Sequence, residues 1–172
     1  MTLMYPVREG EDLFEGINPE IETIPIAYKE PKWKKMCHLL SGKVHRFLKP
    51  ASEISGKSHF DLVVFDTSVV SFRLIDIFKN AGSKIAVIHH NYQYEYFRDN
   101  TSLLLKYPTL FWCRRYEDEA VRKADVNLTL TRQDIKLLSE KYNHGNDSNF
   151  RLLGTFEYRQ EPAKKWNDTL VS

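Results

Sequence analysis

The sequence predicts an α/β fold, a three-layer Rossmann-like lobe with a mostly parallel sheet. Two observations favour this class. Short apolar runs such as FDLVVF and KIAVIH have the composition of strands that are buried on both faces. These runs alternate along the chain with segments of helical periodicity, an arrangement typical of parallel sheets. The 172 residues are enough for one domain with its own hydrophobic core.

The elements follow from the spacing of apolar residues. We expect strands, from short apolar or alternating runs, at 2–5, 21–26, 60–65, 85–89, 125–130 and 150–153. We expect helices, from apolar residues three and four apart, at 32–48, 72–80, 108–123 and 132–142. Pro6 is expected to end the first strand, and Thr131 to cap the last helix with Asp134 at the capping-box position. The segment 52–59 has the composition of a polar turn.

Composition limits the class of protein. No apolar run approaches the roughly 20 residues that cross a bilayer, and the first residues lack the pattern of a signal peptide. Cys37 and Cys113 form neither a disulfide framework nor a zinc-binding spacing, so we expect no metal site. We therefore expect a cytoplasmic protein, which can also be peripheral at the inner face of the plasma membrane.

Basic residues gather in one segment of a chain whose net charge is only +2. Seven Lys or Arg residues and a single acidic residue lie from Lys29 to Lys49, a segment that includes the expected helix 32–48. Basic amphipathic helices can lie on anionic membranes. The candidate membrane-binding residues are Lys32, Trp33, Lys34, Lys35 and Lys43. The alternative is a surface helix whose apolar stripe packs on the sheet, and nothing indicates nucleic acid as a partner.

Polar side chains follow two of the expected strands directly. His90 and Asn91 come after the strand 85–89, and the run 66–68 comes after the strand 60–65. In open α/β sheets, ligands bind in the crevice beyond the carboxyl ends of the strands. We therefore expect a substrate site there, although a strand-end histidine and helix caps are the alternative. The residues of the second run are Asp66, Thr67 and Ser68.

Two further groups are candidates for the same site. Tyr92 and Tyr94 can offer an apolar platform to a sugar ring or lipid, with packing of the loop onto the lobe as the alternative. Thr131 and Arg132 stand at the amino terminus of a helix, where they can bind an anion; the alternative is that Thr131 only caps the helix. By contrast, the charged run 114–122 reads as a solvated helix face with i,i+4 pairs.

Three segments together resemble the amino-terminal, acceptor-side lobe of two-lobed (GT-B fold) glycosyltransferases of family 4. They are FDLVVFDTS, KIAVIHHN and RRYEDEAVRKADVNLTLTRQD. The matching features are His90-Asn91 at a strand end, Ala124-Asp125 before a strand, and Thr131 after it, within residues 1–153. The resemblance implies retaining transfer of a hexose from a nucleotide sugar to a polysaccharide or lipid-linked glycan. His90 is then the catalytic candidate, its backbone carbonyl facing the charge that develops at the anomeric carbon.

The chain also departs from that family's pattern. The first strand with its glycine-rich loop and the donor-binding lobe have no counterpart in the sequence. We expect residues 1–157 to form the acceptor-side lobe and 158–172 to form a linker and the start of a missing lobe. Alone, this fragment is then inactive. Its expected partners are a donor-binding lobe from the same gene or a separate chain, a glycan or lipid-linked acceptor, and a second copy paired through an open sheet edge.

Two other functions remain open from the sequence. One is a non-catalytic α/β module that binds a sugar, a phosphate or a protein partner. The other is a nicotinamide-dependent Rossmann enzyme, which the lack of any G-x-G-x-x-G motif disfavours. No cofactor is expected apart from the nucleotide sugar as co-substrate.

Overall fold

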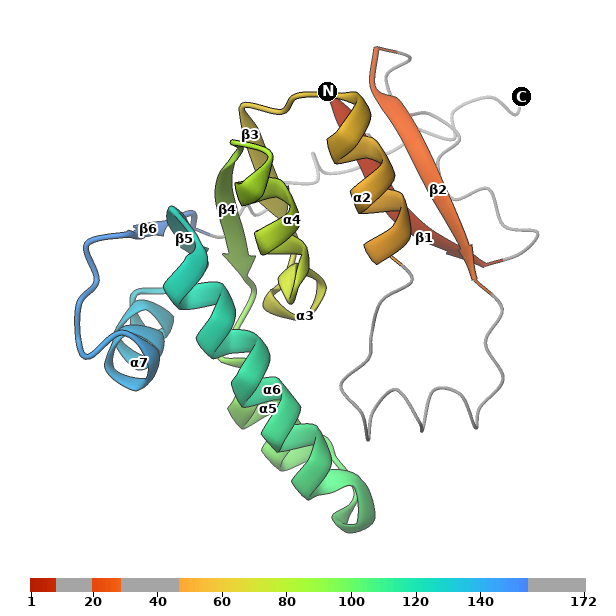
Figure 1. The fold of residues 1–172 in the computed structure, drawn as a ribbon. Coiled ribbons are helices and arrows are strands. Elements are labelled where there is room, and N and C mark those ends of the chain that lie inside the picture. Colours follow the sequence, from red (N-terminus) through yellow and green to blue (C-terminus); the bar gives the residue numbers. More distant parts are fainter. Residues whose placement is uncertain (9–19, 29–46, 155–172) are drawn as a thin grey trace, which may run out of the picture.

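The structure is a computed structural model that describes residues 1–8, 20–28 and 47–154 of the chain (Figure 1). The strands are β1 (Thr2–Arg8), β2 (Glu22–Tyr28), β3 (Leu62–Phe65), β4 (Lys84–His89), β5 (Val126–Thr129) and β6 (Phe150–Leu152). The helices are α2 (Leu48–Lys57), α3 (Ser68–Ser71), α4 (Leu74–Asn80), α5 (Gln93–Asn100), α6 (Leu103–Lys123) and α7 (Arg132–Tyr142). No described helix is long and apolar enough to cross a membrane.

Every strand pair in the described residues is parallel. The strands β3, β4, β5 and β6 lie side by side in chain order, while β1 and β2 form a separate two-stranded sheet. In the larger sheet, Val63 is level with Ile85, and His89 is level with Thr129. The prediction of an α/β, Rossmann-like lobe with a mostly parallel sheet is therefore confirmed.

The helices between the strands of the larger sheet cover one of its faces (Figure 1). This follows from the strand order, because right-handed crossovers between successive neighbouring strands all pass on the same side. Phe65, Ile85 and Val87 point into this covered side and are buried. On β3, the alternating residues Leu62 and Val64 are instead 57% and 50% exposed. The edge strand β3 thus presents apolar side chains to solvent.

The smaller sheet joins the same hydrophobic core through α2. Ile26 of β2, Phe47 and the fully buried Ala51 belong to one cluster with Phe65 and Ile85 of the larger sheet. The expected turn at 52–59 is wrong, because α2 continues to Lys57. Its proline, Pro50, stands in the first helical turn, where a missing N–H breaks no hydrogen bond.

Other boundaries also shifted. β1 continues through Pro6, α6 begins at Leu103, upstream of Pro108, and α5 occupies a segment for which we expected a loop. The helix expected at 72–80 is α4 with the short α3 before it. The membrane-binding candidates Lys32, Trp33, Lys34, Lys35 and Lys43 lie outside the described residues, as does the expected linker 158–172.

Hydrogen bonds of Asp125 link the start of β4 to the start of β5. Its Oδ2 accepts a hydrogen bond from the backbone N–H of Ile85 at 2.8 Å, and its own N–H donates to the Ile85 carbonyl at 2.9 Å. The ammonium groups of Lys79 and Lys84 each lie 3.9 Å from this carboxylate. The aspartate of the Ala124-Asp125 pair therefore holds the register of two central strands.

Replacing Asp125 tests this role. Asp125→Ala leaves the Ile85 N–H, which belongs to a fully buried residue, without its acceptor. We expect the free energy of unfolding to fall by about 1–3 kcal/mol, as for other orphaned buried groups. Asp125→Asn keeps an acceptor oxygen and should lose much less. Urea denaturation checks both, and equal losses in the two variants would contradict this role.

Candidate functional site

The residues predicted at the ends of two neighbouring strands meet in the structure. His90 follows β4 and Asp66 follows β3, and His90 Nε2 lies 2.6 Å from Asp66 Oδ1. Both side chains are exposed, with 48% of the His90 side chain open to solvent. Because a carboxylate only accepts hydrogen bonds, Nε2 carries the shared proton. Nδ1 of a neutral His90 is then left as an acceptor at the carboxyl-end rim of the sheet. Asn91 beside it is exposed.

Thr67 and Ser68, the other predicted residues after β3, make structural contacts. The hydroxyl of Thr67 accepts a hydrogen bond from the Val70 N–H at 3.3 Å and caps α3. Ser68 is buried and donates to Gln93 Oε1 at 3.3 Å. This bond joins the first residue of α3, just beyond β3, to the first residue of α5. The exposed functional groups at the rim are therefore those of Asp66, His90 and Asn91.

A buried carboxylate holds the beginning of α5. Glu117 of α6 is fully buried, and its Oε1 accepts a hydrogen bond from the Gln93 N–H at 2.7 Å. Its Oε2 accepts from the Tyr142 hydroxyl of α7 at 2.8 Å. Burial raises the pKa of Glu117 to about 7, against the lowering effect of the hydrogen bonds from Tyr142 and from the amides of Gln93 and Tyr94. Burial together with Glu117 also raises the pKa of Tyr142.

The predicted aromatic platform is divided between core and surface. Tyr92 is buried in a cluster with Val121, Leu138 and Tyr142, and its ring centroid lies 6.3 Å from that of Tyr142. Tyr94 stacks on Tyr92 at 5.9 Å and is half-buried. Tyr92 therefore packs the loop onto the lobe, which was the alternative considered for it. Its ring is not open to a ligand in this structure.

His89, the neighbour of His90, points to the opposite, covered side of the sheet. Its Nε2 lies 2.9 Å from Asn127 Oδ1, and the Asn127 amide donates in turn to the Val121 carbonyl at 3.1 Å. Burial lowers the pKa of His89, against the hydrogen bond with Asn127. This histidine is thus a neutral, structural member of the core.

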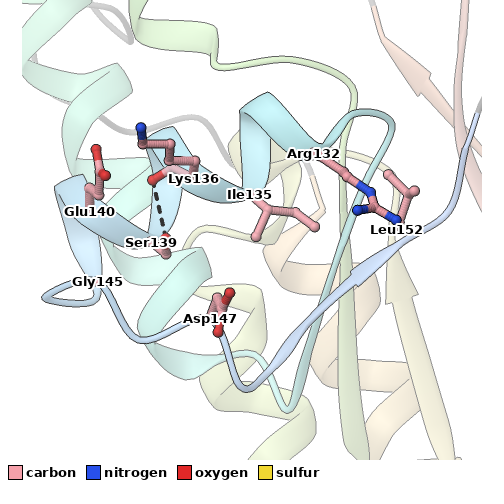
Figure 2. A pocket seen from close by; sticks show the side chains of 8 residues that line it. All are labelled: Arg132, Ile135, Lys136, Ser139, Glu140, Gly145, Asp147 and Leu152. Carbon is pink, nitrogen blue, oxygen red and sulfur yellow. Dashed lines mark hydrogen bonds between the residues drawn. The ribbon is translucent and has the colours of Figure 1, made fainter.

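Thr131 and Arg132 lie at the carboxyl end of β5. Thr131 caps α7 as predicted: its hydroxyl accepts from the Asp134 N–H at 3.1 Å and donates to the Asp134 carboxylate at 2.6 Å. Arg132 lines a pocket of about 540 Å³ formed by α7 and the segment that leads into β6. In Figure 2 its side chain extends toward Leu152 of β6, two strands away from His90 in the sheet.

The walls of this pocket carry both signs of charge. Lys136 and Arg132 contribute positive groups, and Glu140 and Asp147 negative ones, around the half-buried Ile135 (Figure 2). The pocket therefore shows no preference for an anion. Among the described residues, no group of three or more His, Cys, Asp or Glu side chains is arranged to hold a metal ion.

Sequence reasoning missed Gln93 and Glu117. The run 114–122 was expected to be a solvated face, and the Asp118–Arg122 pair is indeed present at 2.6 Å. Glu117, however, is buried on the same side of α6 as Cys113, Ala120 and Ala124. The spacing of these positions by three and four is visible in the sequence, so it marks the inner side of the helix. No pattern in the sequence singles out Gln93.

The buried Glu117 predicts a pH dependence of stability. Since its pKa in the folded chain, about 7, exceeds its ordinary value of 4.5, folding favours the protonated form. This contribution is complete below pH 4.5 and is lost as the pH rises to about 7, a change on the order of 3 kcal/mol. Glu117→Gln should flatten this pH dependence in urea denaturation and be the more stable chain at pH above about 7.

Two variants control this measurement. Glu140→Gln changes an exposed carboxylate on α7 and should keep the wild-type pH profile. Glu117→Ala orphans the Gln93 N–H and the Tyr142 hydroxyl and leaves a cavity, so below pH 4.5 it should destabilise the chain by about 2–4 kcal/mol. Because it also lacks the titrating carboxyl, this loss relative to wild type should shrink as the pH rises to about 7. A wild-type pH slope in Glu117→Gln would contradict the role given to this carboxylate.

Comparison with known proteins gave no match: no protein-family model, no curated protein and no solved structure corresponds to this chain. The interpretation of the site therefore depends on its geometry and on the sequence features described above.

Proposed function

We propose that this chain is the acceptor-side part of a retaining glycosyltransferase, which transfers a hexose from a nucleotide sugar to a polysaccharide or lipid-linked glycan. The observation that carries the proposal is the exposed His90–Asp66 pair, joined at 2.6 Å across the carboxyl ends of β4 and β3. Ligands of open parallel sheets bind at that end. The pair stands where the resemblance to family 4 expects the transferred sugar.

The chemistry of the pair suits a sugar hydroxyl. Asp66 orients the imidazole and keeps the proton on Nε2, so that Nδ1 of the neutral ring can accept a hydrogen bond from a hydroxyl. The amide of Asn91 adds both a donor and an acceptor. The backbone carbonyl of His90 is a fixed dipole, and such dipoles stabilise charge that develops in a transition state. In retaining transfer this charge is positive and lies at the anomeric carbon.

The strand order is consistent with the same resemblance. In the usual doubly wound sheet the order is 3-2-1-4-5-6, so the first strand lies between the second and the fourth. If β1 and β2 are the second and third strands of that order, the first strand belongs between the two sheets. The described residues are divided at that place, into β1–β2 and β3–β6.

The proposal assigns the donor side to another polypeptide segment. The described residues provide no cluster of cationic groups for the leaving diphosphate at the His90 rim, since Arg132 points toward β6. A donor-binding lobe, from the same protein or from a separate chain, would supply those groups and most of the affinity for the nucleotide sugar.

The test is release of nucleoside diphosphate. The full chain is mixed with the polypeptide encoded next to it, a membrane lipid extract as acceptor, and UDP-glucose, UDP-galactose or GDP-mannose in turn. We expect release with one of these donors only when both polypeptides are present. His90→Ala removes the imidazole but keeps the backbone carbonyl, so the rate should fall by about ten-fold, as for the loss of one hydrogen bond to the sugar. Asp66→Asn should lower it by a smaller factor.

The chain offers a matched control for this pair. His59 lies 3.7 Å from Asp61, and both side chains are exposed, but they stand at the opposite, amino end of β3. His59→Ala should leave the rate unchanged. Full activity in His90→Ala would overturn the assignment of the site. Saturable binding of a glycan without release from any donor would favour the non-catalytic sugar-binding module instead.

A further inference from the structure

Three large apolar side chains of α6 stand in solvent on one side of the helix. Leu103, Tyr107 and Phe111 are 82%, 84% and 62% exposed. They are spaced by four residues, and residues four apart on a helix lie above one another. They therefore form a continuous line along the first half of α6, which we call the α6 ridge. Exposed apolar groups that adjoin in this way mark interaction surfaces.

The α6 ridge lies on a part of the molecule that protrudes. The second half of α6 packs on the sheet through Ala120 and Val121, which are fully buried. The first half extends beyond the sheet, and α5 runs beside it (Figure 1). The ridge is thus a convex edge near the end of a helical arm. A convex edge suits a broad surface better than it suits a peptide or a small ligand.

The helical segment that carries the ridge bears charges of one sign. The segment from Leu103 to Arg115 contains three basic residues and no acidic one. No carboxylate of the described residues lies within ion-pair distance of these three, which are Lys106, Arg114 and Arg115. The nearby acids of α5, Glu95 and Asp99, are paired with Arg98 at 3.8 and 2.8 Å. The ridge therefore combines exposed apolar side chains with unpaired positive charge.

We propose that the α6 ridge docks on the surface of an anionic lipid bilayer. Leucine and the two aromatic rings enter the headgroup region, where amphipathic aromatic side chains are favoured. Lysine and arginine contact lipid phosphates. The helix lies on the membrane and does not cross it, in accord with the lack of a spanning helix in the described residues.

A second copy of the chain fits this surface less well. In a two-fold symmetric contact the same patch faces itself. Lys106, Arg114 and Arg115 of one copy would then approach the same residues of the other, and the segment 103–115 contains no carboxylate to neutralise them. A layer of anionic headgroups offers the opposite charge. Charge complementarity therefore selects the bilayer as the occupant.

The test is sedimentation of the full chain with vesicles. We expect binding to phosphatidylcholine vesicles that contain phosphatidylglycerol, little binding to phosphatidylcholine alone, and weakening by salt. The triple variant Leu103→Gln, Tyr107→Gln, Phe111→Gln should lose most of this binding. Replacing Lys106, Arg114 and Arg115 by Gln should weaken it by about five-fold for each basic residue, the loss expected at an anionic surface.

Three controls make the result decisive. Leu62→Gln removes an exposed leucine from β3, away from the ridge, and should bind as wild type does. All ridge variants should keep the wild-type unfolding midpoint, because the replaced side chains are exposed except for the half-buried Lys106. The third control is a variant in which Lys32, Lys34, Lys35 and Lys43 are replaced by Gln. Adding the ridge substitutions to this variant should still reduce its binding to anionic vesicles.

Three outcomes would overturn the proposal. The first is no binding of the wild-type chain to anionic vesicles. The second is unchanged binding of the ridge variant, which would assign any membrane contact to the lysine segment. The third is a dimer, seen by light scattering, that the ridge variant abolishes while vesicle binding is absent. None of these results depends on whether the chain takes part in glycosyl transfer.

Discussion

The arrangement of the lobe around its candidate site depends on one buried carboxylate. Glu117 reaches from the middle of α6 to the first N–H of α5 and to the Tyr142 hydroxyl of α7. Among the described residues no cation is paired with it, and its oxygens accept hydrogen bonds there from the neutral Gln93 N–H and Tyr142 hydroxyl. Such a carboxylate needs both donors in place, because a buried charged group that loses a hydrogen-bond donor destabilises the folded state. Three helices therefore have to keep their mutual positions for the carboxylate to remain bonded.

This constraint fixes the segment that carries the candidate site. Only Asn91 and Tyr92 separate His90 from Gln93, whose N–H binds Glu117 and whose side chain accepts from Ser68. The loop is thus held from α6 on one side and from the end of β3 on the other. His90 itself is joined to Asp66 on the same end of β3. Buried contacts therefore hold the backbone beside His90, and the exposed Asp66 orients its imidazole, which is how a rigid scaffold prepares a polar group for a ligand.

The sequence was sufficient for the elements whose pattern is local. The apolar runs located β3, β4 and β5, and Thr131 with Asp134 located the start of α7, because a buried strand and a helix cap depend on a few neighbouring residues. It was insufficient for α5, whose aromatic and charged residues follow no clear helical period and whose start depends on Glu117, distant in the chain. Of the residues predicted at strand ends, Asp66 and His90 are the pair whose exposed side chains meet in the structure. Tyr92 and Ser68 are engaged by partners that become visible only in the folded chain.

A single helix connects the surfaces discussed above. The α6 ridge occupies its first half, Glu117 its centre, and Ala120 and Val121 the part that packs on the sheet. A helix transmits displacement along its length because its backbone hydrogen bonds are satisfied internally. The bond between Glu117 and Gln93 lies between the ridge and the part of α6 that packs on the sheet. The buried carboxylate therefore joins the helix that carries the ridge to the segment that follows His90.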